Sequence, residues 1–247
     1  MIKKILLNAL SVVLLSSTVN ADFLGAEAGY AVWLPKFTGT IKGSGNLDAD
    51  INAEDELGFG DTTTNIFVWA YFDHPMPLLP NIKIIKTNYT DEANTNTNIV
   101  FGNKSYTSNA KTSLTLDQLD IIGYYRLLDN WVNLDLGFNF KFIDGVFKIS
   151  NNNSNIDKEF NLVLPALYAK ARADLPFSGL SVEADGSYIG YSGNKITDIK
   201  FGISYDVFYG LGLNAGYRIQ KLTLNDVDNI NTMIDINGMY AGLFYHF

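Results

Sequence analysis

Residues that commonly carry catalysis or bind metals are scarce in this sequence. The chain of 247 residues has no cysteine and only two histidines, His74 and His246. Thiol nucleophiles and zinc–thiolate sites are therefore excluded, and a serine hydroxyl without a neighbouring base is a poor nucleophile. We predict a protein that is not an enzyme, with no catalytic residues, no cofactor and no metal site.

Charged side chains that alternate with apolar ones are the other candidates for chemistry. If these segments are strands, side chains of one parity share a face, and opposite charges on neighbouring strands can pair. Across a turn at 174–178, Lys170 is expected near Glu183. Arg172 is expected near Ser181 and Glu183. We predict that one charge network on this face contains Asp135, Lys141, Lys170, Arg172, Glu183, Asp185, Lys200 and Arg218.

The alternation itself predicts long β-strands. In WVNLDLGFNFKFI, residues 131–143, apolar and polar residues alternate over six repeats, which is the period of a strand and not of a helix. A tilted strand crosses a bilayer in about 9–11 residues, so this segment is long enough to span one. Similar segments predict about ten strands, with eight as the alternative, at 24–40, 63–73, 81–90, 112–127, 131–149, 159–173, 179–191, 195–208, 211–224 and 233–247.

The connections between these segments are sorted by length. Short turns and longer polar loops largely alternate along the chain, which is typical of transmembrane β-barrels. We therefore predict an all-β fold, a transmembrane antiparallel up-and-down β-barrel with lipid outside, charges in the lumen and both termini in the periplasm. The first periplasmic turn is assigned to His74, Pro75, Pro77 and Pro80, because proline cannot donate to a strand ladder.

The beginning of the chain predicts export. Lys3 and Lys4 precede an apolar stretch that ends in VNA, which predicts a signal peptide over 1–21 and a barrel over 22–247. Removal of two lysines changes the formal net charge from −8 to −10. Such an acidic chain is a poor partner for nucleic acid, and the expected partners are outer-membrane lipids.

Aromatic residues and one short motif complete the prediction. Tyrosines and tryptophans near the strand ends suit interfacial girdles, namely Trp33, Trp69, Tyr124, Tyr125, Trp131, Tyr188, Tyr205 and Tyr209. Trp33-x-Pro35, Trp69 and the following HPMPLLPN resemble an uncharacterised family of Gram-negative outer-membrane β-barrel proteins. The resemblance implies fold and location but no activity. It also implies that the terminal Phe247 is an assembly signal for the barrel assembly machinery.

Three functions remain open at this point. The favoured one is a mainly structural outer-membrane barrel, either plugged by its charges or with a narrow, porin-like polar conduit. A surface-binding or adhesion role is the alternative, for which the acidic first loop at 41–62 is a candidate. A barrel-embedded hydrolase is less favoured. An omptin-like protease would need a histidine at the extracellular rim, and a lipid A deacylase-like enzyme would need one on the lipid-facing wall.

Overall fold

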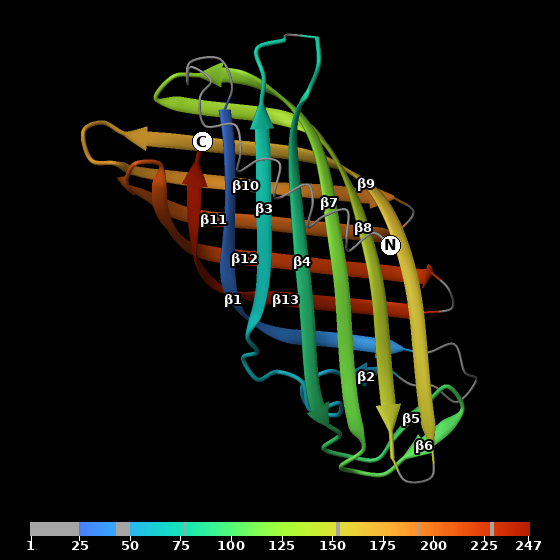
Figure 1. The fold of residues 1–247 in the computed structure, drawn as a ribbon. Coiled ribbons are helices and arrows are strands. Elements are labelled where there is room, and N and C mark those ends of the chain that lie inside the picture. The colour runs from blue at the N-terminus through green and yellow to red at the C-terminus, as the bar shows by residue number, and fades with distance from the viewer. Residues whose placement is uncertain (1–24, 43–49, 77, 152–153, 192, 228–229) are drawn as a thin grey trace, which may run out of the picture.

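The computed structural model describes residues 25–42, 50–76, 78–151, 154–191, 193–227 and 230–247. Within them, ten long antiparallel strands form one up-and-down barrel (Figure 1). They are β1 (Gly25–Lys42), β3 (Asn65–Asp73), β4 (Asn81–Asn94), β7 (Lys111–Asp129), β8 (Val132–Ser150), β9 (Asn155–Leu175), β10 (Leu180–Tyr191), β11 (Asn194–Phe208), β12 (Leu211–Val227) and β13 (Ile230–His246). Pairing of β13 with β1 closes the barrel. The prediction of an all-β barrel with ten strands is confirmed, whereas the predicted signal peptide lies outside the described residues.

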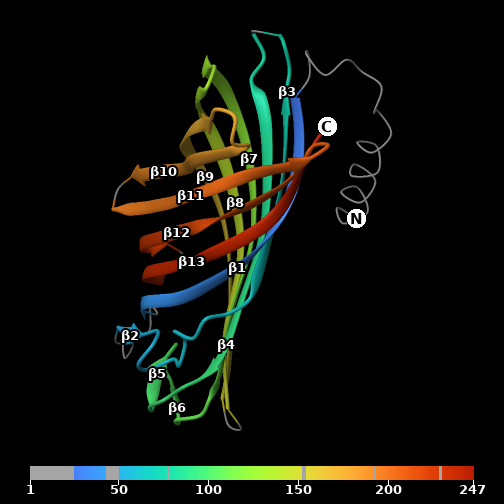
Figure 2. The same cartoon turned by 90° about the vertical axis from the view of Figure 1, so that its left-hand side faces the viewer.

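The two ends of the barrel differ. Short turns join the strands at one end, which we call the turn end, and the described chain begins and finishes there (Figure 1). The other end, the loop end, carries three short strands, β2 (Ile51–Asn52), β5 (Ile99–Phe101) and β6 (Lys104–Tyr106). Figure 2 shows these pieces gathered beneath the loop end of the wall. Within the described residues, no helix is long and apolar enough to cross a membrane.

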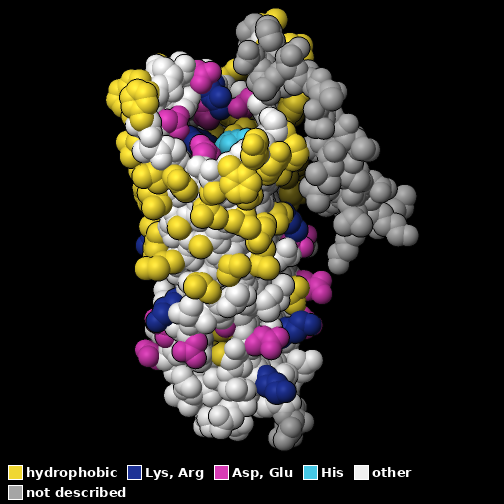
Figure 3. Space-filling view, turned by 60° about the vertical axis from the view of Figure 1, so that its left-hand side comes forward, with side chains coloured by type: hydrophobic (Ala, Val, Ile, Leu, Met, Phe, Trp, Pro, Cys, Tyr) yellow, Lys and Arg dark blue, Asp and Glu magenta, His cyan; other side chains and the backbone are white. Residues whose placement is uncertain are grey.

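An apolar band surrounds the turn-end half of the barrel. Outward side chains there are large, apolar and exposed, and Figure 3 shows them as a belt with charged groups below it and in the mouth above it. The band includes Val32, Leu34, Ile66, Val68, Phe138, Phe140, Phe201, Ile203 and Met239. Exposed apolar surface on this scale marks a face that another apolar phase covers, and for a closed barrel that phase is lipid.

The loop-end half has the opposite arrangement, so the predicted pattern of lipid outside and charge inside describes the turn-end half. In β8, Phe138 and Phe140 are exposed and Lys141 is buried, but farther along Ile149 is buried and Asp144 is exposed. In β8, the odd-numbered residues face inward in both halves. The strands have up to 21 residues, about twice what a bilayer needs, so the loop-end half stands in water and buries apolar side chains instead.

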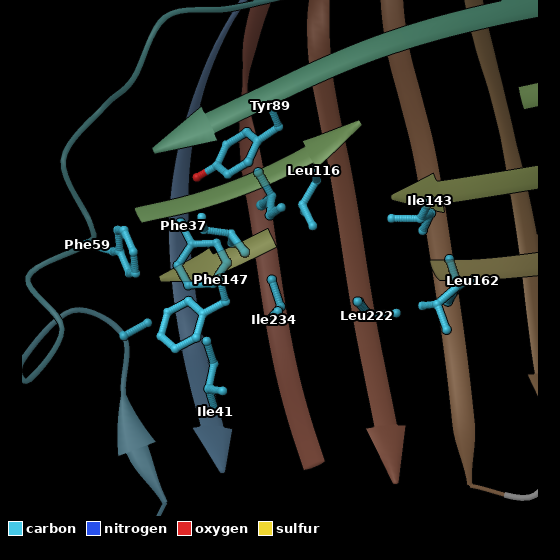
Figure 4. Close-up of a cluster of buried hydrophobic side chains, with 14 of the residues drawn as sticks. Phe37, Ile41, Phe59, Tyr89, Leu116, Ile143, Phe147, Leu162, Leu222 and Ile234 are labelled. Carbon is cyan, nitrogen blue, oxygen red and sulfur yellow. The ribbon is translucent and has the colours of Figure 1, made fainter. Parts of the chain in front are cut away.

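A hydrophobic core therefore fills the loop-end half of the lumen. Figure 4 shows side chains from several strands in this core, including Phe37, Tyr89, Phe147 and Leu222. The connections after β1 and β4 cover this core. Phe59 packs edge-on against Phe37 with ring centroids 5.2 Å apart, and Phe101 does the same against Phe147 at 5.4 Å.

Candidate functional site

The centre of the lumen holds a buried charge cluster. Arg218 donates to both oxygens of Asp198, from Nε at 3.0 Å and from Nη2 at 2.8 Å. The ammonium of Lys141 lies 3.0 Å from Asp198 and 2.8 Å from Asp120. Gln220 also donates to Asp198 at 2.8 Å. Bidentate arginine–carboxylate pairs combine strength with fixed geometry, so this cluster ties β7, β8, β11 and β12 together.

Arg218 reaches across the lumen to the opposite wall. Its guanidinium carbon lies 5.0 Å from the ring centroids of both Trp33 and Phe67, a cation–π geometry. Its Nη1 donates to Thr87 Oγ1 at 2.9 Å. The Arg218 residue is 0% exposed. One side chain thus joins β12 to β1, β3 and β4 through the barrel axis.

A second cluster centres on Asp185. Lys83 lies 2.7 Å from its carboxylate and Lys200 lies 3.1 Å away. The hydroxyl of Tyr168 donates to the same carboxylate at 3.3 Å. Glu183, on the same strand, lies 3.4 Å from Lys170, which is the pair expected from the sequence.

The third cluster lies nearest the turn end. Arg126 bridges Asp73 at 2.9 Å and Asp135 at 3.1 Å. Arg172 stands opposite Glu183 in the strand register, but its guanidinium pairs with Asp174 at 2.8 Å. The expected proximity of Arg172 to Glu183 is confirmed by the register, although the ion pair of Arg172 forms with a carboxylate two residues along the same strand.

All eight charges of the predicted network are inward, and the structure divides them among these three clusters. Lys83 was not predicted as part of this set, because isoleucines flank it on both sides at positions 82, 84 and 85. Its parity with the buried Thr87 and Tyr89 was the available signal. The prediction that Trp33, Trp69 and Tyr124 lie at the lipid interface is wrong. Their strand neighbours of opposite parity face lipid, and these three rings lie in the lumen.

Both histidines lie at the turn end. His246 Nδ1 is 3.3 Å from Glu27 Oε2, and Trp69 Nε1 donates to the other oxygen of Glu27 at 2.7 Å. His74 accepts from the Met76 backbone N–H at 3.2 Å through Nδ1. The other ring nitrogen of His74 lies 3.1 Å from a backbone oxygen of the same turn. His74 is thus bonded within its own turn.

The remaining predicted residues sit at the same end. Pro75 and Pro80 belong to the first turn, and Pro77 lies outside the described residues. The backbone N–H of Phe247 donates to the Ala26 carbonyl at 2.9 Å, so the last residue is tied to β1. The Phe247 ring is 44% exposed on the lipid side. Its role as an assembly signal stays a prediction.

Small cavities lie in the described part of the lumen. One cavity of about 30 Å³ lies at the turn end between Glu27, Tyr71 and Lys170. Another of about 30 Å³ lies between Gln118, Lys141 and Leu222, where the charges meet the hydrophobic core. Each has room for about one or two waters. No group of acidic and histidine side chains in the described part of the chain could hold a metal ion.

The acidic first loop is organised by its own hydrogen bonds. The Asn52 side-chain oxygen accepts from the backbone N–H groups of Glu54 and Asp55 at 2.9 and 2.8 Å. Glu56 accepts from the Asn52 backbone N–H at 2.7 Å. These bonds form a local turn. Residues 43–49 of this loop lie outside the described residues.

Comparison with solved structures identifies the fold. The chain is similar to the outer membrane protease OmpT from Escherichia coli, with a TM-score of 0.50 and 13% identity over 94% of this chain and 99% of that one. It is also similar to the translocator domain of the autotransporter NalP from Neisseria meningitidis, with a TM-score of 0.43 and 12% identity over 99% and 96% of the two chains. Ail of Yersinia pestis aligns with a TM-score of 0.35 and 10% identity over 90% and 99%.

No protein-family model matches the sequence, and no curated protein matches it. The similarity to OmpT therefore carries the fold alone. A closed antiparallel barrel with an apolar outer band is an integral outer-membrane protein.

Proposed function

We propose that this chain is a sealed, mainly structural barrel of the outer membrane, with its turn end in the periplasm. The observation that carries the proposal is Arg218, which spans the lumen fully buried between Asp198, Trp33 and Phe67. A permeant solute would have to break these contacts of Arg218 and also cross the hydrophobic core in the loop-end half. The described part of that core is mostly apolar, so it replaces little of the solute's hydration.

Planar-bilayer recording tests the seal. The refolded barrel is expected to give no resolvable unitary conductance, and stable channel openings would contradict the proposal. A double variant, Trp33→Ala with Arg218→Ala, removes the two side chains that meet on the axis. Heat-modifiable migration in gels shows whether this variant is folded, and a leak through it would show that the recording detects an opened lumen.

We also infer that the barrel is not an enzyme. The neighbour OmpT is described as a protease, but only its fold is comparable with this chain. Here both histidines are at the turn end, and each is held by neighbouring groups. The expected result is no cleavage of a mixed peptide library and no release of fatty acid from outer-membrane lipid by the refolded protein. Either activity, if lost in His246→Ala, would contradict the inference.

The orientation has its own test, helped by the absence of native cysteine. Asp144→Cys places a thiol on the exposed outer wall of the loop-end half, and Asp129→Cys places one at the turn end. A membrane-impermeant maleimide is expected to label the first in intact cells and the second only after permeabilisation. The reverse pattern would contradict a periplasmic turn end.

Membership of the Trp-x-Pro and HPxPLLPN family remains part of this proposal. The motif residues have structural roles that a family could share, since the Trp33 ring contacts Arg218 and Pro75 and Pro80 lie in the first turn. A surface-binding role is the second candidate function. It is favoured by one feature of the loop-end wall, an edge of β9 with which no described strand pairs.

A further inference from the structure

The tilt of the strands leaves two notches in the loop-end wall. β3 begins only at Asn65, so β1 beyond Trp33 and β4 beyond Asn88 lose it as a partner. Pairing between β9 and β10 stops at Leu167 with Tyr188, and β9 continues toward the loop end past the end of β10 (Figure 1). Each notch exposes the edge of a strand, and unpaired edges are templates for another strand.

The chain closes the first notch with its own segment. β2 pairs with the end of β1, through Thr40 with Asn52 and Ile41 with Ile51. Farther along the notch, the Ala53 backbone N–H donates to Gly39 at 2.8 Å. On the β4 side, the Asn96 backbone N–H donates to the Glu56 carbonyl at 3.0 Å. A short extended piece with main-chain hydrogen bonds is therefore what a notch of this barrel accepts.

The second notch has no such cover among the described residues. Residues 155–166 of β9 pair with β8 on one side, from Ser150 with Asn155 to Asn139 with Ala166. On the other side no described strand pairs with them. Lys104 contacts only the tip, where its Nζ donates to the Asn155 carbonyl at 2.9 Å. The edge is about 40 Å long at a strand rise of about 3.3 Å per residue.

Most of this edge lies on the loop-end side of the apolar band. The outward residues Asn155, Asp157, Glu159 and Asn161 are polar and exposed, and the apolar outward face begins at Val163. Water therefore satisfies the unpaired backbone groups of this polar part of the edge until a partner replaces it. Pro165 lies where the notch enters the band and has no N–H group, which removes one donor where an unpaired donor would face lipid.

The side chains beside the edge define what would fit. On the outer face, Lys148 neutralises Asp157 at 3.0 Å, while Asp144 and Glu159 have no ion pair among the described residues. The register sets Asp144 opposite Asn161 and Val146 opposite Glu159, so these two acids are diagonal neighbours. On the inner face, Phe160 and Leu162 adjoin the hydrophobic core, and Lys158, nearer the tip, is exposed. A matching strand has basic side chains outward and apolar side chains inward.

We propose that the free edge of β9, residues 155–162, binds an extended strand of a partner protein by β-augmentation. The strand alternates basic and apolar residues. It adds to β9 as β2 adds to β1, so main-chain hydrogen bonds supply affinity and the alternating side chains supply specificity. The binding surface faces the cell exterior, beside the connections that cover the hydrophobic core.

Hydrogen exchange of the refolded barrel tests whether the edge is free. Every second amide of 155–162 is expected to exchange at least about tenfold faster than the doubly paired amides of 168–174. Equal protection of the two stretches would overturn the proposal. The paired strand β2 is the internal reference for a closed notch.

A synthetic probe tests acceptance of a strand. A nine-residue peptide of alternating lysine and valine is expected to bind and to slow exchange only in 155–162. The matched peptide of alternating glutamate and valine is expected to bind at least about tenfold more weakly, because the surface acids then repel it. Absence of lysine-peptide binding, or binding without protection of 155–162, would overturn the proposal.

Charge reversal locates the site. The double variant Asp144→Lys with Glu159→Lys is expected to weaken lysine-peptide binding about tenfold. The control is Asp129→Lys, which replaces an exposed acid at the turn end. It is expected to leave binding unchanged. Both variants must retain heat-modifiable migration. Equal affinity for both variants would contradict the assignment to β9.

Discussion

The turn-end half and the loop-end half of this barrel are built from the same strands with opposite polarity. On the turn-end side of the middle of β8, Phe138 and Phe140 face out and Asn139 and Lys141 face in. On the loop-end side, Asp144 faces out and Ile149 faces in. The backbone geometry is continuous through the change. The outer solvent, lipid or water, therefore decides which face is apolar.

The two interiors are held together by different forces. The turn-end lumen depends on paired buried charges, whose desolvation is offset only by good geometry. The loop-end lumen depends on close packing of apolar side chains. Substitutions placed at equivalent depths of the two halves should separate these contributions.

The largest effect is expected at the centre of the charge cluster. Arg218→Ala leaves Asp198 buried without its bidentate partner, and breaking such a pair costs about 3–5 kcal/mol of unfolding free energy. Lys221→Ala, three residues along the same strand, removes an exposed pair with Asp235 at 3.0 Å and should cost about 0–1 kcal/mol. Urea unfolding in detergent measures both. Similar losses would contradict a structural role for the network.

The next effect concerns the hydrophobic core of the loop-end half. Leu222→Ala should lose about 3 kcal/mol because it leaves a cavity among well-packed neighbours. Leu213→Ala, on the lipid face of the same strand, should lose much less, since lipid chains refill the space. The same unfolding assay compares the two. A larger loss for Leu213→Ala would show that the loop-end half is not packed as described.

A polarity exchange tests the boundary between the halves directly. Phe140→Lys places a charge in the apolar band and should cost about 2–4 kcal/mol near its middle. Asp144→Leu, four residues away on the water-facing wall, should change the unfolding free energy by about 0.5 kcal/mol or less. If Asp144→Leu proved strongly stabilising in lipid vesicles, the band would extend farther than its exposed residues indicate.

The smallest effect is expected in the connection after β4, which covers the hydrophobic core. Tyr106 is 1% exposed, and its hydroxyl has no hydrogen-bond partner among the described residues. Burial raises the pKa of the Tyr106 phenol, so the group stays neutral over the working range of pH. Tyr106→Phe should stabilise the barrel by about 1 kcal/mol because an unsatisfied buried hydroxyl is removed. A loss of stability of similar size would mean that the hydroxyl has a partner.

The sequence predicted the strands and the inward parity of the charges well. Period-two alternation survives any environment, so each of the ten strands was placed within a few residues of its observed bounds. The polarity of the loop-end half could not be read in the same way. An apolar residue such as Ile143 looks the same whether its neighbour is lipid or a hydrophobic core, and only the height of the residue in the barrel distinguishes them.

The contacts across the lumen were also beyond the sequence. Parity places Arg218 inside, but it does not say that Trp33 and Phe67 receive it from strands far away in the chain. The same holds for Arg172, whose partner was set by side-chain reach and not by register. The sequence by itself determined the strands, their two faces and the proline turn, because these follow from local periodicity and backbone chemistry. Only the closed tertiary structure decided which charges meet, where the lumen is blocked and which strand edge stays free, because strand tilt sets how distant segments face one another.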